Sequence, residues 1–253
     1  MNSSQVPRRS VYVVLPAYNE AASVGAVIQE LARTGFEAGI EFHVIVVDDG
    51  SGDSTAEVVR SYTNRVPIVL LEHASNLGLG VAIRDGLLKA VDSASDGDVI
   101  VTMDADDTHT PSAIVEMVQK IDQGYDVLIA SRYQKGSRTV GVPLMRRFLS
   151  YAGSMVIRTL FPIRGVKDFT CGYRAYRAPV LRQAVERYRA EFINQEGFQC
   201  MVDILLKLSR LGLRFGEVPF VLRYDRKGGK SKMKVFRTAY GTLALLFKRR
   251  LGF

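Results

Sequence analysis

Short apolar runs alternate with amphipathic stretches through the first half of the chain. The apolar runs predict buried strands at residues 11–16, 42–50, 66–72, 98–106 and 126–133. Between them, apolar residues recur at helical spacing in residues 20–34, 53–62, 80–91 and 110–121. This regular alternation predicts an α/β fold with a mostly parallel sheet and helices on both of its faces.

Signals for helix ends accompany two of these segments. In the first helix Gly35 stands where a C-cap glycine is expected, after apolar positions that end at Leu31. In the fourth helix Thr110 fits the N-cap and Pro111 the first helical position.

The alternation fades after residue 133. We expect a loop at 134–143, an apolar helix at 144–161, a helix at 197–212 that Gly212 ends, and a final strand at 214–224. The last stretch predicts an amphipathic C-terminal helix with cationic flanks, whose apolar side comprises Phe236, Ala239, Tyr240, Leu243, Leu246 and Phe247.

Charge is concentrated at the C-terminal end. From Arg223 to Phe253 there are ten Lys or Arg and one acid, Asp225, so this segment has a net charge of +9. The whole chain has a net charge of +8, and residues 1–222 therefore sum to −1. Such an end favours an anionic partner. We therefore divide the chain into a flexible N-terminus (1–10), a main α/β domain (11–222), and a basic loop with an amphipathic helix (223–253).

The compartment is predicted from what the sequence lacks. The two cysteines form no disulfide framework, which is typical of a reducing compartment. Residues 1–10 contain no apolar signal-peptide core, and no apolar run is long enough to span a bilayer. We expect a cytoplasmic location.

Acidic residues follow two predicted strands. Asp104 and Asp106, separated by one residue at the end of a buried strand, can converge on a hard divalent cation such as Mg²⁺ or Mn²⁺. The alternative is a turn that caps the next helix. Asp48 and Asp49 can accept hydrogen bonds from a ribose or a base, or can form a plain β-turn with Gly50 and Gly52.

Two further segments are candidates for binding phosphates. The stretch NLGLG, residues 76–80, can let the backbone approach a nucleotide, although the first turn lacks the GxGxxG of a dehydrogenase. The stretch RYDRKGGKSKMK, residues 223–234, is either a phosphate clamp or a solvated basic face. His43, His73 and His109 are scattered and form no recognisable Ser/His/Asp set.

Taken together and in order, these segments resemble glycosyltransferase family 2. The matching stretches are LPAYNE, VVDDGSGDST, NLGLG, DAD, ASRY and GEVP followed by DRKGGKSK, within residues 11–236. Together with DFTCGYRAYR they resemble the dolichyl- or polyprenyl-phosphate mannose synthases, and the QxxRW motif of cellulose-synthase-like relatives is absent.

The resemblance implies a GT-A fold, a nucleotide-sugar donor and roles for named residues. Pro16, Tyr18, Glu20, Val47 and Asp49 match positions that hold the nucleoside. Asp104 and Asp106 match the metal ligands, with the Ala105 backbone between them. Arg132, Arg226 and Lys232 match basic residues around the donor diphosphate and the acceptor phosphate. Thr108 departs from relatives that place Gln or Ser there as a further metal ligand.

We therefore expect a metal-dependent, inverting glycosyltransferase that moves a sugar, mannose from GDP-mannose, onto a polyprenyl phosphate. It would sit peripherally on the cytoplasmic membrane face through its basic end or a separate anchoring protein. The alternatives are a family 2 enzyme with another nucleotide sugar or a soluble acceptor, and a non-catalytic module that binds nucleotide sugar or anionic membrane. We do not expect nucleic acid as a partner, because the apolar side of the last helix suits lipid better.

Overall fold

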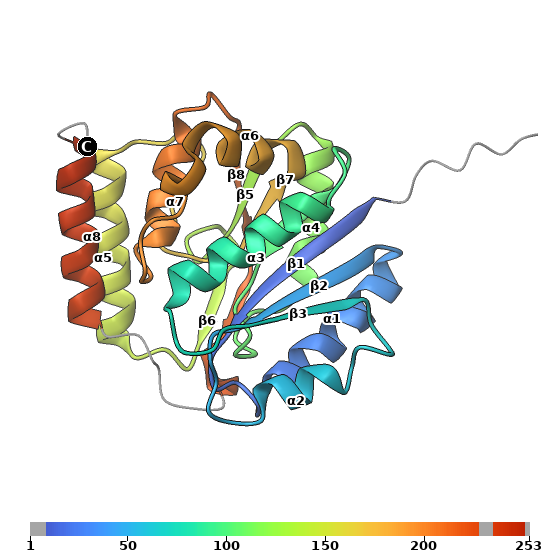
Figure 1. Cartoon of the computed structure of the whole chain (residues 1–253). Coiled ribbons are helices and arrows are strands. Elements are labelled where there is room, and N and C mark those ends of the chain that lie inside the picture. Colours follow the sequence, from blue (N-terminus) through green and yellow to red (C-terminus); the bar gives the residue numbers. More distant parts are fainter. Residues whose placement is uncertain (1–8, 228–234, 251–253) are drawn as a thin grey trace, which may run out of the picture.

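The computed structural model describes residues 9–227 and 235–250, and its centre is a seven-stranded sheet. The strand order is β3-β2-β1-β4-β7-β5-β8, and only β7 runs antiparallel to its neighbours. Five strands are those expected from the apolar runs: β1 (Ser10–Ala17), β2 (Glu41–Asp48), β3 (Ile68–Glu72), β4 (Val99–Thr102) and β5 (Val127–Ser131). The mostly parallel sheet is confirmed, and helices lie on both of its faces (Figure 1).

The remaining sheet strands, β7 (Arg174–Arg177) and β8 (Phe215–Pro219), come from the second half of the chain. The sequence pattern missed β7, which inserts between β4 and β5, because its first residue is a fully buried arginine. Arg174 donates hydrogen bonds to the carbonyl oxygens of Phe169, Cys171 and Met201 at 2.5–2.9 Å. These three acceptors compensate for removing the guanidinium from water.

Eight α-helices lie in the described residues. They are α1 (Val24–Ala38), α2 (Thr55–Arg60), α3 (Leu79–Ser93), α4 (Ser112–Asp122), α5 (Leu144–Leu160), α6 (Ala178–Tyr188), α7 (Cys200–Ser209) and α8 (Val235–Arg250).

Both predicted helix-end signals are wrong by a short distance. The first helix continues past Gly35 and ends at Gly39, which takes the left-handed conformation with φ 65°. The fourth begins at Ser112 with Pro111 as its N-cap, and no side chain caps it. Gly35 instead allows a close approach, because a Cβ there would lie 2.8 Å from the Ile40 carbonyl oxygen.

A second, two-stranded sheet lies within the segment expected to be a loop. It pairs β6 (Arg138–Val140) with β9 (Val221–Arg223) in parallel, so the predicted final strand is divided into β8 and β9. An isolated bridge joins His109 to Leu222 of β9, and the Arg223 amide donates to the Thr108 carbonyl at 2.9 Å. These bonds hold the start of the basic segment against the loop that follows β4.

The last helix is present, and its single apolar side stays a prediction, because the side chains of Phe236, Ala239 and Tyr240 lie outside those that the structure describes. Leu245 and Leu246 are buried in the main core, whereas Leu243 and Phe247 are exposed. Arg249 pairs with buried Asp203 of α7 at 2.7 Å and holds α8 against the domain. No helix in residues 9–227 or 235–250 combines the length and apolar composition needed to cross a bilayer.

Helix α3 packs closely over β1 and β2, in front of the sheet in Figure 1. A Cβ on Gly86 of α3 would lie 2.4 Å from Val14 Cγ1 and 3.0 Å from Val47 Cγ2. Only glycine lets the helix lie this near the strands whose ends build the site described below.

Gly86→Ala is therefore expected to lower the free energy of unfolding by about 1–3 kcal/mol through overpacking. Gly153→Ala in α5 is the matched control, because a Cβ there meets nothing within 4 Å. That variant should gain up to about 1 kcal/mol from helix propensity. Urea unfolding followed by circular dichroism measures both, and equal effects of the two substitutions would contradict the packing argument.

Candidate active site

The carboxyl ends of β1, β2 and β4 meet at one edge of the sheet. β1 is parallel to both neighbours, with Ala17 level with Asp48 and Val14 level with Thr102. The strand order reverses between β1 and β4, and open α/β sheets bind ligands outside the carboxyl ends of strands at such a point. The polar segments that follow these strands are therefore brought to one place.

Hydrogen bonds join the loops after these strands. The Asn19 amide donates to Ser51 Oγ, and the Gly52 amide donates to Asn19 Oδ1, both at 2.8 Å. Ser23 Oγ lies 2.9 Å from Glu20 Oε2 and 3.0 Å from the Ala105 carbonyl oxygen. The loops after β1, β2 and β4 thus form one connected frame.

The glycine-rich loop is fixed by Asp49. The Asp49 carboxylate accepts hydrogen bonds from the Leu77 and Gly78 amides at 2.9 Å and lies 2.7 Å from His73 Nδ1. His73 is in turn 3.2 Å from Asp85. Asp49 is 3% exposed, so in this arrangement its carboxylate positions the loop at 76–80.

The other predicted nucleoside positions differ in accessibility. Tyr18 is exposed, and Pro16 and Glu20 are partly exposed at the end of β1. Val47 is fully buried beneath α3, so the structure does not bring its side chain to the surface of the site. Pro16, Tyr18 and Glu20 therefore offer a surface to a nucleoside, and Val47 does not.

Asp104 and Asp106 lie just beyond β4 and have different surroundings. Asp104 is partly exposed, and its Oδ2 lies 3.9 Å from Nε2 of the buried His109. Asp106 is buried, and Thr108 Oγ1 donates to its Oδ1 at 2.6 Å. The Thr108 hydroxyl, which the sequence left open as a third metal contact, is therefore used to orient Asp106.

A lysine contacts Asp106 from the other end of the chain. Nζ of Lys227 forms an ion pair with Asp106 Oδ2, and the two side chains are 16% and 8% exposed. Lys227 follows the short turn after β9, which the pairing of β6 with β9 holds in place. The basic segment thus places one cation inside the acidic cluster.

The two carboxyl groups are shifted in opposite directions. Burial raises the pKa of Asp104, helped by the charges of Asp106 and Glu20 and opposed by His109 and Lys227. Burial also acts to raise the pKa of Asp106, but His109, Lys227 and the Thr108 hydroxyl together lower it. Negative charge is therefore favoured on Asp106 over Asp104, and Asp106 already pairs with the Lys227 ammonium.

The donor set fits a hard divalent cation that a substrate also helps to bind. No group of three or more His, Cys, Asp and Glu side chains in the described ranges is arranged to hold a metal ion. Mg²⁺ and similar cations are usually held by one or two carboxylates together with substrate phosphates and waters. Asp104 and Asp106 supply that number of carboxylates, and the Lys227 ammonium shows that a cation is accommodated beside them.

Arg132 is held rigidly after β5. Its Nε and Nη2 donate to the two oxygens of the fully buried Asp168 at 2.8 and 2.7 Å, and Nη2 also donates to Thr170. Burial works against charge on Asp168, but Arg132 outweighs it and lowers the pKa of that carboxyl. Buried Glu217 accepts from the Lys167 and Asp168 amides at 2.6 and 2.7 Å and orders this segment.

The segment that orders Arg132 also reaches the acidic cluster. A Cβ on Gly172 would lie 3.8 Å from Asp104 Oδ1, and the Gly172 carbonyl accepts from Thr102 of β4. Arg226 lies 3.9 Å from Asp107, next to Asp106. Lys232, predicted for the same region, lies outside the described residues.

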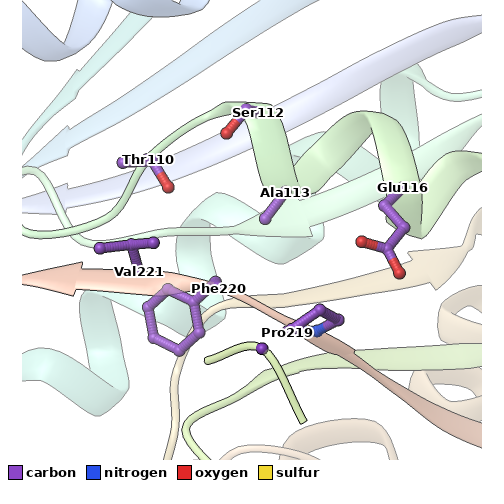
Figure 2. Close-up of a pocket in the computed structure, with 8 residues that line it drawn as sticks. Thr110, Ser112, Ala113, Glu116, Pro219, Phe220 and Val221 are labelled. Carbon is purple, nitrogen blue, oxygen red and sulfur yellow. The ribbon is translucent and has the colours of Figure 1, made fainter. Parts of the chain in front are cut away.

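Two hollows lie near these elements. The larger, about 410 Å³, is lined by Tyr133, Tyr151, Ser154, Met155, Arg158, Thr159 and Lys167. Ser154 Oγ is buried there with no hydrogen-bond partner among the described residues. The smaller, about 190 Å³, lies between the start of α4 and the β8–β9 segment and contains none of the predicted site residues (Figure 2).

Three parts of this arrangement were not predicted from the sequence. Lys227 lay within the basic segment as one cation among several, with no signal of its partner. Asp168 and Glu217 lay in stretches whose buried carboxylates follow no periodic pattern. For Glu217 the available signal was an acid within a predicted strand, since Glu217 lies inside β8.

Comparisons with known proteins identify the family of this chain. The model of Glycosyl transferase family 2 matches residues 12–184. The Undecaprenyl-phosphate mannosyltransferase of Micrococcus luteus is 34% identical over 224 residues, which are 88% of this chain and 87% of the relative. The Dolichol-phosphate mannosyltransferase of Pyrococcus furiosus is 32% identical over 225 residues, which are 88% of this chain but only 59% of that relative.

Solved structures show the same fold. Glucosyl-3-phosphoglycerate synthase from Mycobacterium tuberculosis, in complex with Mn²⁺, UDP and phosphoglyceric acid, has a TM-score of 0.68 at 19% identity, covering 96% of this chain and 78% of that one. TarS 1–349 of S. aureus has a TM-score of 0.58 at 22% identity, covering 84% and 60%. The chain therefore belongs to glycosyltransferase family 2, and it is a glycosyltransferase with a GT-A fold.

Proposed function

We propose that the enzyme transfers a sugar from a nucleotide donor to a polyprenyl phosphate, with inversion and with a divalent cation. The observation that carries this proposal is the meeting of Asp104 and Asp106 with the Lys227 ammonium at the switch point of the sheet. Because both substrates carry phosphate, the site has to bind two mutually repelling anions. Relatives named as polyprenyl- and dolichol-phosphate mannosyltransferases support this substrate class.

In this proposal, Asp104 and Asp106 hold the cation, and the bound cation neutralises charge that develops on the departing nucleoside diphosphate. Pro16, Tyr18 and Glu20 hold the nucleoside at the end of β1, beside the loop that Asp49 positions. The donor we propose is GDP-mannose, since the named relatives are mannosyltransferases. Mg²⁺ and Mn²⁺ both satisfy the oxygen donors present.

The acceptor needs little activation from the protein. A phosphate monoester is anionic at neutral pH, so it can attack the sugar carbon without a strong general base. This explains why no nucleophile and base pair is needed beside the carboxylates. Arg132 provides a planar cation whose Nη1 has no hydrogen-bond partner among the described residues. We propose that Arg132, with Arg226 and Lys232, holds the phosphates of the acceptor and the donor.

The lipid part of the acceptor requires an apolar surface, and α5 offers one. Its exposed apolar side chains, the α5 face, are Leu144, Met145, Phe148, Leu149, Tyr151, Met155, Val156 and Leu160. A soluble protein rarely leaves so large an apolar patch without a partner. Figure 1 shows α5 and α8 at the same end of the molecule. We propose that this end rests on the cytoplasmic membrane face, with the basic C-terminal segment or an anchoring protein adding to the attachment.

A donor panel tests the proposed reaction. GDP-mannose, UDP-glucose and UDP-N-acetylglucosamine are each supplied with a short polyprenyl phosphate and Mg²⁺ or Mn²⁺, and transfer is followed by mass spectrometry of the lipid. We expect mannosyl-phosphoryl polyprenol from GDP-mannose only. Transfer from none of the three would point to a soluble acceptor or to a binding module.

Asp104→Asn is expected to lower turnover at least about a hundredfold, because a metal clamp contributes several kcal/mol to the transition state. It should also abolish the effect of Mn²⁺ on nucleotide binding, measured by calorimetry. Asp122→Asn is the control, since Asp122 is exposed and, within the described part of the chain, forms an ion pair with Arg9 alone. Unchanged turnover in Asp104→Asn would remove the metal from the mechanism.

The membrane proposal is tested by flotation with vesicles that contain anionic phospholipid. The double variant Met145→Glu/Phe148→Glu should bind at least about tenfold more weakly, because each side chain would lose about 1.5–3 kcal/mol of apolar burial. Phe36→Glu is the control, because Phe36 is 90% exposed but lies on α1. Equal loss in the control would show a charge effect unrelated to the α5 face.

A further inference from the structure

Among the described lysines and arginines, Lys227 forms an ion pair with a predicted metal ligand, and the other contact of this kind is that of His109, which is charged only when protonated, with Asp104. Its Nζ contacts Asp106 Oδ2, the oxygen that Thr108 leaves free, because Thr108 Oγ1 and the Thr108 amide both donate to Oδ1. Only 16% of the Lys227 side chain is exposed. The ammonium therefore occupies the coordination position that Asp106 would offer to a metal ion.

The charges around Lys227 show what the pair neutralises. Burial acts against a charged ammonium, but Asp106, Asp104 and Glu20 outweigh it and raise the pKa of Lys227. Two of these three carboxylates, Asp104 and Asp106, are the ones that would hold a divalent cation at this place. A second cation on Asp106 would repel the ammonium strongly, since protein surroundings screen charge less well than water.

We propose that Lys227 is a tethered competitor for the divalent cation. In the enzyme without donor it neutralises Asp106, and a metal ion binds there only as the ammonium moves away. This inference rests on the metal site of the proposed function and adds to it a specific role for one residue. It concerns the order in which cation and donor bind.

The donor diphosphate provides the reason for the lysine to leave. Phosphate oxygens near the acidic pair offer the ammonium a new partner, so donor and metal ion would each favour the state in which Lys227 is displaced. Two ligands that favour the same state strengthen each other's binding by the same factor. The metal ion would therefore be recruited chiefly together with the donor.

A purely structural ion pair predicts a different result. If Lys227 only stabilised the fold, its removal would leave the repulsion between the two carboxylates without a compensating positive charge. The affinity for a metal ion in the absence of donor would then not increase. If it competes, its removal must increase metal affinity in the absence of donor. When the paired state is populated about 90% of the time, the apparent affinity is reduced about tenfold, and the variant regains that factor.

The test measures Mn²⁺ binding to the full-length protein without nucleotide, by electron paramagnetic resonance of free Mn²⁺. Lys227→Met and Lys227→Gln should bind Mn²⁺ about tenfold more tightly than the wild type. Lys227→Arg, which keeps the charge, should bind like the wild type. Lys89→Met on α3 is the control for net charge, since it removes one cation away from this site. Circular dichroism melting confirms that each variant is folded.

The titration is repeated with GDP at saturation. GDP should increase Mn²⁺ affinity in every variant, but by a smaller factor in Lys227→Met, because the lysine no longer has to be displaced. Equal Mn²⁺ affinity in the wild type, Lys227→Met and Lys227→Gln would overturn the inference while leaving the metal site intact. Absence of Mn²⁺ binding in all of them, with and without GDP, would overturn both the inference and the metal clause of the proposed function.

Discussion

The concentration of negative charge at the end of β4 is the constraint on which the site depends. The charges of Asp106 and Glu20 lie close enough to raise the pKa of Asp104, and Asp106 is buried. Bare carboxylates in such a place are costly unless a positive charge meets them. The chain meets this requirement with Lys227, which lies 121 residues beyond Asp106 in the sequence. The β6–β9 pair and the His109–Leu222 bridge hold the segment that delivers it.

A second charge pair, with a fully buried aspartate, lies at the end of β5. Asp168 binds Arg132 through two oxygens and also accepts backbone amides, while Glu217 orders the residues just before it. Removing either partner would leave an uncompensated charge in the interior, so the guanidinium has a fixed place and direction. Arg132 is thus paired with a fully buried carboxylate, whereas Lys227 pairs with a carboxylate of the acidic cluster.

The fold explains where a substrate binds, but the identity of the substrate depends on features added to the fold. Solved neighbours at 19–22% identity share the GT-A fold, and they carry no argument about the acceptor of this enzyme. The apolar α5 face is such an added feature, because α5 lies outside the sheet and the apolar side chains of this face are exposed. It lies at one end of the molecule, together with α8, which Arg249 ties to the catalytic domain. The candidate active site at the sheet edge and the apolar α5 face together match a substrate that has a charged head and an apolar tail.

The sequence alone determined the parallel half of the sheet, its covering helices and the acidic cluster after β4. These features follow from the spacing of apolar residues that are near neighbours in the chain, and so a local pattern suffices to predict them. Tertiary structure alone decided that β7 inserts antiparallel around a buried Arg174, that the Val47 side chain is buried beneath α3, and that Asp168 fixes Arg132. It also decided that Lys227, rather than another cation of the basic segment, pairs with Asp106 among the described residues. Buried ion pairs join residues far apart in the sequence, and no periodicity encodes which charge will meet which.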